Sequence, residues 1–211
     1  MSTLCAPDSP LARDTREMVQ QLSPQWLVHH CLRSYHFASA LGRKRGVRFD
    51  DELLFVATLL HDLGLTDAYN DDTRFEVAGA NAARAFLRGR GIPEDRIAVV
   101  WDAIALHTSV GIAAAKGGEV ALAHAGIHMD VLAQDADQLD ASFVAETFAA
   151  YPRLGLTRNQ LCDTIAGQLR HKPQKAPPFT FPALVGQALV PGFPVVELSQ
   201  VLSFDGWAQY R

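Results

Sequence analysis

Cysteine is scarce in this sequence of 211 residues. The three thiols, Cys5, Cys31 and Cys162, are odd in number, far apart and without a CxxC pair, so the sequence indicates neither a disulfide framework nor a thiolate zinc knuckle. Residues 1–20 also lack the apolar core of a signal peptide, because charged side chains interrupt them. We therefore expect a cytoplasmic protein with reduced cysteines.

Long apolar runs and clusters of one charge are missing as well. No stretch reaches the length of a membrane span, so we expect no membrane association. The net charge is −4, and the densest basic segment, residues 43–45, lies at a predicted helix end, where it complements the macrodipole. This charge argues against a nucleic-acid partner. A small-molecule substrate is the expected partner, and homo-oligomerisation stays open.

Period-2 alternation, the signature of a half-buried strand, is almost absent, whereas the spacing of apolar residues is helical nearly throughout. Caps, glycines and prolines divide the sequence into helices, which we predict over residues 24–44, 51–64, 74–88, 93–107, 119–133, 141–150 and 158–170. The predicted fold is all-α, a helical bundle that forms one domain over residues 1–172.

Proline is common only in the last part of the chain. Six of the eleven prolines lie in residues 173–211, together with apolar side chains such as Phe179, Phe181 and Trp207. This segment is too apolar for a disordered tail. We expect a mostly irregular arm that packs on the same domain or on a partner subunit, where it closes a pocket or forms a subunit contact.

Two polar residues follow the most apolar helical segment. His61 and Asp62, the HD pair, come directly after the run LLFVATLL at residues 53–60. A buried carboxylate in such surroundings is costly unless it is paired or bound to a cation. The pair alone fits an exposed polar edge equally well, so ligands from other helices are needed to distinguish the two interpretations.

Two other predicted helices supply such candidates. His36 lies in an apolar stripe of its helix, and Asp130 lies on a helix face that is otherwise apolar. His124 and His128, at i and i+4, form a rival pair, but a carboxylate on an apolar face has the greater need of a partner. With the HD pair, His36 and Asp130 offer two imidazoles and two carboxylates. This set suits one divalent metal ion, Zn foremost, with Fe or Mn as alternatives.

The order of these residues resembles that of the HD-domain metalloenzyme superfamily, an all-α family whose ligands follow the pattern H…HD…D. In this chain the pattern reads His36, His61, Asp62 and Asp130, and the resemblance covers residues 24–135. It implies one divalent metal held by these four side chains, and it counts Asp62 among the catalytic residues as well.

Three segments are similar to the cyanamide-hydratase-like branch of this superfamily. They are HDLGLTD at residues 61–67, RFEVAGANAARAFL at 74–87 and WDAIALHTSVG at 101–111. The resemblance implies a metal-dependent hydratase or hydrolase, a hydro-lyase in its cyanamide-hydrating form. Such an enzyme uses a metal-activated water on a small, nitrile-like substrate.

Other branches of the superfamily fit less well. The binuclear members carry two further histidine ligands between the HD pair and the last aspartate. The first is missing here, since residues 80–90 contain no histidine, and His107 corresponds to the second, so a single metal is expected. The bacterial nucleotidases carry a glutamate three residues after the HD aspartate, where this chain has Leu65. A phosphohydrolase for nucleotides or phosphate esters is therefore the alternative and not the first choice.

Further roles follow from position in the sequence. His107 ends a predicted helix beside small residues and is the expected proton donor, with a share in substrate binding. Thr66 and Glu76 are weaker candidates for orienting water or substrate, since a Thr or Glu at a helix end is more often a cap. Arg74 is the candidate that would bind a substrate phosphate.

A third interpretation belongs to another class of protein. An HD domain can bind a metal or a small ligand without turnover, as a sensor or assembly module. Its metal ligands would look the same in sequence, so metal content and activity must be measured together to distinguish it from the two enzymes.

Overall fold

The structure is a computed structural model that describes residues 4–154 and 158–203. In these residues all regular secondary structure is helical, which confirms the predicted all-α class. None of the described helices combines the length and the apolar character needed to cross a bilayer. The α-helices are α1 (Pro10–Leu22), α2 (Gln25–Lys44), α3 (Asp51–Leu60), α4 (Phe75–Arg88), α5 (Glu94–Leu106), α6 (Gly118–Leu132), α7 (Ala141–Ala150), α8 (Arg158–His171), α9 (Phe181–Leu189) and α10 (Leu198–Ser203).

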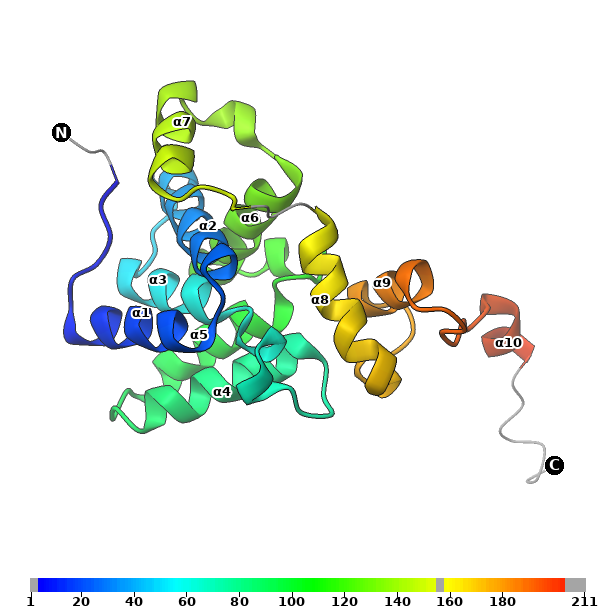
Figure 1. Ribbon diagram of the computed structural model, residues 1–211. Coiled ribbons are helices and arrows are strands. Elements are labelled where there is room, and N and C mark those ends of the chain that lie inside the picture. The colour runs from blue at the N-terminus through cyan, green and yellow to red at the C-terminus, as the bar shows by residue number, and fades with distance from the viewer. Residues whose placement is uncertain (1–3, 155–157, 204–211) are drawn as a thin grey trace.

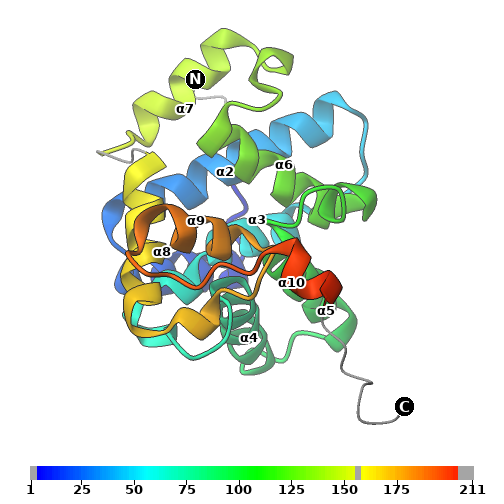
Figure 2. The same ribbon diagram turned by 90° about the vertical axis from the view of Figure 1, so that its right-hand side faces the viewer.

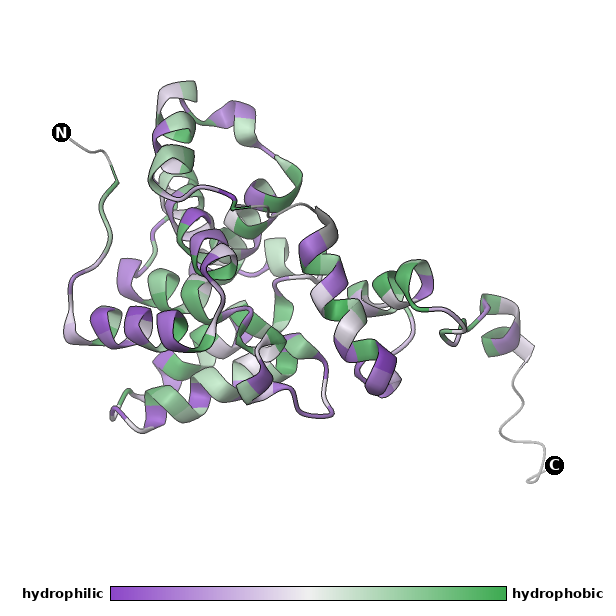
Figure 3. Ribbon diagram, viewed as in Figure 1, coloured by the Kyte–Doolittle hydropathy of each residue, from purple (hydrophilic) through white to green (hydrophobic). Residues whose placement is uncertain are grey.

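Short 3-10 helices connect several of these elements. They are η1 (Leu63–Leu65), η2 (Asp67–Tyr69), η3 (Ala113–Ala115), η4 (Ala136–Gln138) and η5 (Pro173–Lys175). The helices predicted from periodicity correspond to α2–α8, with ends that differ by a few residues. Helix α1 was not among them, and it carries hydrophilic residues along much of its length (Figure 3) while burying Leu11 and Val19.

Helix α3 lies at the centre of the helical body (Figure 1). All of its residues from Leu53 to Leu60 are buried, and α1, α2, α5 and α6 pack around it. A helix that is apolar on every side is buried in this way. Its C-terminal end therefore brings the HD pair into the interior of the domain.

Helices α2 and α6 form the most extensive helix pair of the body. Gly126 of α6 lies directly against the backbone of α2, because a Cβ at this position would be 2.2 Å from the carbonyl oxygen of Ser34. Glycine allows this close approach because it has no side chain. The contact sets the distance at which the side chains of α2 and α6 meet, and the metal centre described below lies between them.

Helices α8 and α9 form a layer on one side of this body, as two perpendicular views show (Figures 1 and 2). A group of buried apolar residues joins this layer to η1 and α4 through Leu65 and Phe75. Lys175, between α8 and α9, is buried and donates hydrogen bonds to Asn70 Oδ1 and Gln168 Oε1, both at 2.6 Å. The first part of the C-terminal arm thus packs on the same domain and contains more helix than its prolines indicate.

The later part of the arm leaves the body. Helix α10 projects away from it (Figure 1) and exposes Leu198, Val201 and Leu202. Trp207, with the rest of residues 204–211, lies outside the described residues. A subunit contact made by this part of the arm stays a prediction.

The variant Gly126→Ala tests how strongly the fold depends on the contact between α2 and α6. The added methyl group would overlap the Ser34 carbonyl, and overpacking of a core contact typically costs about 1–3 kcal/mol. We expect the free energy of unfolding in urea to fall by about this amount. Gly167→Ala is the matched control, since Gly167 of α8 has open space at its Cβ and alanine favours a helix by about 1 kcal/mol. Equal stability of the two variants would contradict this account.

Candidate metal centre

The HD pair lies where α3 passes into η1. His61 closes the helix, and its Nδ1–H donates to the Thr58 carbonyl at 2.7 Å, which leaves Nε2 as the free ring nitrogen. Asp62 begins the next turn, and its Oδ2 lies 3.1 Å from that Nε2. Both residues are buried, with exposed fractions of 1% and 2%. The change of direction at the end of α3 lets two adjacent residues point toward one spot.

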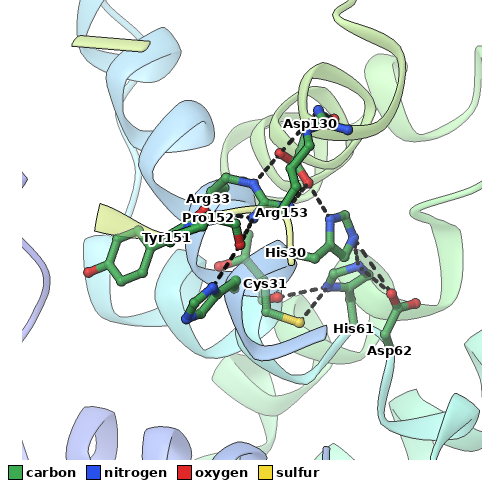
Figure 4. A network of polar contacts seen from close by, with 11 residues as sticks. His30, Cys31, Arg33, His61, Asp62, Asp130, Tyr151, Pro152 and Arg153 are labelled. Carbon is green, nitrogen blue, oxygen red and sulfur yellow. Dashed lines mark hydrogen bonds and ion pairs between the residues drawn. The ribbon is translucent and has the colours of Figure 1, made fainter. Parts of the chain in front are cut away.

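A third side chain reaches the same spot from α2. His30 is buried, and its Nε2 lies 3.1 Å from His61 Nε2 and 3.6 Å from Asp62 Oδ2 (Figure 4). One potential ligand atom from each of these three residues lies within 4.8 Å of the others. We call His30, His61 and Asp62 the metal cluster, because two ring nitrogens and a carboxylate oxygen converge there at distances that suit one cation.

Asp130 of α6 positions His30 by binding the ring nitrogen that faces away from the metal cluster. Its Oδ2 accepts a hydrogen bond from His30 Nδ1–H at 2.6 Å, and Arg33 donates to both carboxylate oxygens at 2.6 and 2.8 Å (Figure 4). Arg33 is fully buried on α2, three residues after His30, so one carboxylate binds two side chains of the neighbouring helix. A carboxylate that binds the far nitrogen of a metal-binding imidazole fixes its tautomer and raises its basicity.

The charges of these groups depend on one another. Burial alone would raise the pKa of Asp130, but the hydrogen bonds from His30 and Arg33 lower it below its ordinary value. Burial would likewise raise the pKa of Asp62 and lower the pKa of His61, and the attraction between the two reverses both shifts. Both carboxylates are therefore ionised at neutral pH, and the negative charge of Asp62 attracts a cation.

The donor set fits a single divalent metal ion. Asp62 Oδ2 is buried and receives no hydrogen bond from the described residues, although His61 Nε2 lies 3.1 Å away. An ionised oxygen in this position is costly unless a cation binds it. Two imidazoles and one carboxylate with an open position are a common set for catalytic Zn²⁺ and also occur with Fe²⁺.

His36 does not join this cluster, which corrects the expected ligand set. It lies six positions after His30 on α2 and thus about 120° away around the helix axis. Its ring stacks on Tyr151, with centroids 5.4 Å apart, and lines a separate cavity together with Arg16. Burial and then the charge of Arg16 lower the pKa of His36 to about 4. His30, on the side of α2 that faces Asp130, occupies the place expected for His36.

Asp130 is also not a direct member of the metal cluster. Its two oxygens are engaged by Arg33 and His30, so it contacts the cluster only through the His30 ring. Its assignment as a ligand is thereby corrected to that of a carboxylate that positions a ligand. The sequence located the right carboxylate on the apolar face of α6, but its main partner is a buried arginine and not a metal.

His107 approaches the cluster from the end of α5. Its Nδ1–H donates to the Ile104 carbonyl at 2.7 Å, its Nε2 lies 3.8 Å from Asp62 Oδ1, and its carbonyl accepts from His124 Nδ1–H at 2.7 Å. Burial and then the neighbouring His61 lower the pKa of His107 to about 4. The ring is therefore neutral at pH 7 with its lone pair toward the cluster. Such a ring suits the acceptance of a proton before its donation, whereas donation alone was expected.

Thr66, Glu76 and Arg74 make their hydrogen bonds away from the cluster. Thr66 Oγ1 donates to the Leu63 carbonyl at 2.7 Å and so closes η1. Glu76 is fully buried and accepts hydrogen bonds from Arg74 Nη2 and Thr108 Oγ1, both at 2.7 Å. None of the three lines the cavity at the cluster. Their predicted roles in orienting water or binding substrate therefore find no support in these contacts.

A cavity of about 200 Å³ opens onto the metal cluster. Apart from the cluster and His107, its polar lining consists of Thr108 and His128. The rest of the lining is apolar and comes mainly from Phe75, Val110, Ile127, Val131, Leu161 and Phe181. Because Leu161 belongs to α8 and Phe181 to α9, the C-terminal layer forms one wall of the cavity.

Comparison with known protein families identifies the chain. The HD domain family matches residues 27–142, which is more than half of the chain, and the chain belongs to this family. The matched segment contains the metal cluster, Asp130 and His107. HD domains bind divalent metals and are generally metal-dependent hydrolases. A comparison with individual curated proteins found no match.

Sequence reasoning missed His30 and Arg33. The sequence contained a signal for both residues. They are three positions apart within α2, which is largely buried, and therefore lie on one face of that helix. A buried arginine requires a carboxylate partner, and Asp130 was the carboxylate that lacked one. Pairing these two charges would have placed His30 beside Asp130.

His30→Ala and His36→Ala form a matched pair, since both remove a buried imidazole from α2. We expect His30→Ala to lose its metal and the thermal stabilisation that the metal provides, because a ligand that binds only the folded state stabilises it by mass action. His36→Ala should keep its metal. Elemental analysis after dialysis, with melting curves before and after chelation, measures both effects. Metal loss in His36→Ala alone would restore the ligand set expected from the sequence.

Asp130→Asn should destabilise the metal-free protein by about 3–5 kcal/mol, the cost of removing one partner from a buried ion pair. The pKa of Asp130 is lower in the folded protein than in the unfolded chain, where it is about 3.9. Its contribution to stability is therefore complete above that pH and is lost as the pH falls below it. In urea unfolding, the difference between wild type and variant should be constant near neutral pH and shrink below about pH 4.

Asp135→Asn is the control for this experiment. It removes a half-exposed ion pair with Arg45, which contributes at most about 1 kcal/mol. A loss of stability in Asp130→Asn that is no larger than in this control would show that the buried network does not hold α2 and α6 together.

Proposed function

We propose that the chain is a metal-dependent hydratase or hydrolase that adds water to a small uncharged substrate, with a nitrile such as cyanamide as the favoured class. The observation that carries the proposal is the position of the metal cluster at a small, mostly apolar cavity. The similarity of the segments at residues 61–67, 74–87 and 101–111 to the cyanamide-hydratase-like branch supports the same reaction.

The residues at the cavity supply the steps of such a reaction. A divalent ion held by His30, His61 and Asp62 would acidify a water molecule and polarise the substrate. His107 then accepts the water proton at Nε2, since its Nδ1–H is engaged by a backbone carbonyl. The water oxygen bonds to the nitrile carbon, and the nitrogen takes the proton back from His107. Tautomerisation gives an amide, or urea when the substrate is cyanamide.

The lining of the cavity disfavours the alternative, a phosphohydrolase. Among the residues that the structure describes, this lining contains no lysine or arginine. Arg74, which was expected to bind a phosphate, is paired with the buried Glu76 at 2.7 Å. A phosphate ester would bring its charges against apolar side chains, which is costly without compensating partners.

The third interpretation, a metal-binding module without turnover, has less support. Structural metal sites are closed by protein ligands, whereas catalytic sites keep a position open for water or substrate. The metal cluster has three protein ligands and faces a cavity. We propose Zn²⁺ as the bound ion, with Fe²⁺ or Mn²⁺ as alternatives.

His107→Ala should keep its fold and its metal but lose about 10²–10⁴ in rate, the usual contribution of a positioned acid or base. Single-turnover kinetics and metal analysis of the same preparation check this expectation. His171→Ala, which removes an exposed histidine on α8, is the control and should retain full activity. If His107→Ala loses its metal, the residue is a further ligand, and its role in proton transfer has to be abandoned.

The reaction itself is tested with the full chain loaded in turn with Zn²⁺, Fe²⁺ and Mn²⁺. Cyanamide, small nitriles and p-nitrophenyl phosphate are supplied as substrates, and Asp62→Ala serves as the inactive control. We expect release of urea or amide that depends on the metal and on Asp62. Turnover of the phosphate ester alone would favour the phosphohydrolase. Stoichiometric metal with no turnover of any substrate would favour the binding module.

A further inference from the structure

We propose that the site prefers substrates that combine an apolar body with one polar reactive group, with about six to nine non-hydrogen atoms in all. Such substrates are preferred over the smallest nitriles, such as cyanamide. This inference deepens the proposed function and depends on it for the nature of the reactive group. The size and the apolar character of the preferred substrate are inferred from the volume and the lining of the cavity.

The volume of the cavity sets the size of the ligand. Its roughly 200 Å³ exceeds the volume of about 150 Å³ with which an engineered apolar cavity in another protein binds benzene. A molecule as small as cyanamide would leave most of this space unfilled. The side chains around unfilled space lose dispersion contacts. A ligand that fills the cavity gains these contacts and is preferred.

The polarity of the lining limits the ligand to one polar group. The metal cluster and His107 form one polar region, and the other two polar lining residues already have partners. The Thr108 hydroxyl donates to Glu76 at 2.7 Å, and the His128 ring is hydrogen-bonded to Gln134 and to the His107 backbone. Among the lining residues in the described part of the chain, Asp62 is the only one that carries a carboxylate, and none is a lysine or an arginine. A second polar group on the ligand would face apolar side chains and remain without a partner, which costs binding free energy.

Two apolar residues of the lining also reach the surface. Val110 and Leu132 line the cavity and are also exposed to solvent, at 75% and 49%. Exposed apolar side chains of this kind attract apolar surface and offer no partners to a hydrated ion. These two residues therefore favour the same class of ligand as the interior.

One wall of the cavity is formed by residues outside the segment that matches the HD domain family. Leu161 of α8 and Phe181 of α9 line the cavity, and both lie after the matched segment 27–142. The two helices form a layer beside the body (Figure 2) and are held there by buried contacts with Leu65 and Phe75. Residues outside the matched segment therefore contribute to the size limit, whereas the matched segment supplies the metal cluster and the rest of the lining.

A series of straight-chain nitriles tests the inference with the metal-loaded full chain. Each buried methylene improves binding about fourfold. We expect kcat/KM to rise by about this factor with each carbon from acetonitrile up to about six to nine non-hydrogen atoms, and to fall beyond that length. Cyanamide should be among the poorest substrates. A flat series, or cyanamide as the best substrate, would overturn the inference.

Phe181→Ala and Phe179→Ala are matched variants for the same series. Phe181 lines the cavity, whereas Phe179 is 71% exposed and does not line it. The first variant enlarges the cavity and should shift the optimum to longer nitriles, and the second should leave it unchanged. Leu161→Ala provides a second enlargement from α8, should the loss of Phe181 weaken α9. An optimum that stays the same in both enlarged variants would contradict the assignment of the wall.

Binding of toluene separates this inference from the proposed reaction. Toluene has no group to hydrate, so a rise in the melting temperature of the full chain reports on the cavity alone. Leu161→Trp, which fills the cavity, should abolish the rise, and Phe179→Ala should retain it. If toluene binds in this way and no nitrile is hydrated, the substrate class stands and the reaction is wrong. If nitriles are hydrated in a flat series and toluene does not bind, the reaction stands and the substrate class is wrong.

Discussion

The carboxylate of Asp130 is the group on which the rest of the centre depends. It lies fully buried between α2 and α6 and receives hydrogen bonds from Arg33 and His30. Separating a buried arginine from its carboxylate leaves an uncompensated charge in an apolar interior, which is strongly unfavourable. Because Arg33 and His30 lie on one face of α2, the requirement to pair the arginine also fixes the position of the imidazole. The close approach at Gly126 makes this pairing possible.

The ends of two helices orient the other imidazoles of the centre. The last carbonyls of a helix have no partner within it, and side chains nearby can use them as acceptors. His61 and His107 each close a helix and donate Nδ1–H to the carbonyl three residues earlier. Together with His30, whose Nδ1–H binds Asp130, they present three Nε2 atoms to the region around Asp62. The rings are thus oriented by contacts that do not require a metal to be bound.

Part of this arrangement could be predicted from the sequence, and the reasons are specific. The run at residues 53–60 is apolar on every side of a helix, so its burial followed directly. For the HD pair that follows it, an exposed polar edge stayed open until candidate ligands on other helices were considered. Asp130 could be chosen because a carboxylate on an apolar face needs a partner. The helical period alone could not decide between His30 and His36 as the partner of this carboxylate. Both histidines are buried in α2, which has buried residues around its whole circumference, and periodicity does not show which side faces α6.

The roles assigned to Thr66, Glu76 and Arg74 show a second limit of sequence reasoning. Each was chosen for its chemistry and its nearness in sequence to the HD pair or to a helix end. The structure shows that their hydrogen-bonding groups are used by one another, by Thr108 or by the backbone. Local sequence patterns could not predict the apolar wall from α8 and α9 either, because this wall depends on packing between segments far apart in the chain.

The wall formed by α8 and α9 places part of the substrate selection outside the segments that carry the chemistry. The buried charged groups of the centre and the candidate metal ligands lie in α2, in α6 and at the end of α3, where a substitution of one disturbs the charge balance of the others. Leu161 and Phe181 take no part in this charge balance, since their contacts are apolar. Other apolar side chains of similar volume can replace them at a modest cost in stability. A lineage with this architecture can therefore acquire a new substrate by remodelling one outer layer, while the inherited metal centre stays unchanged.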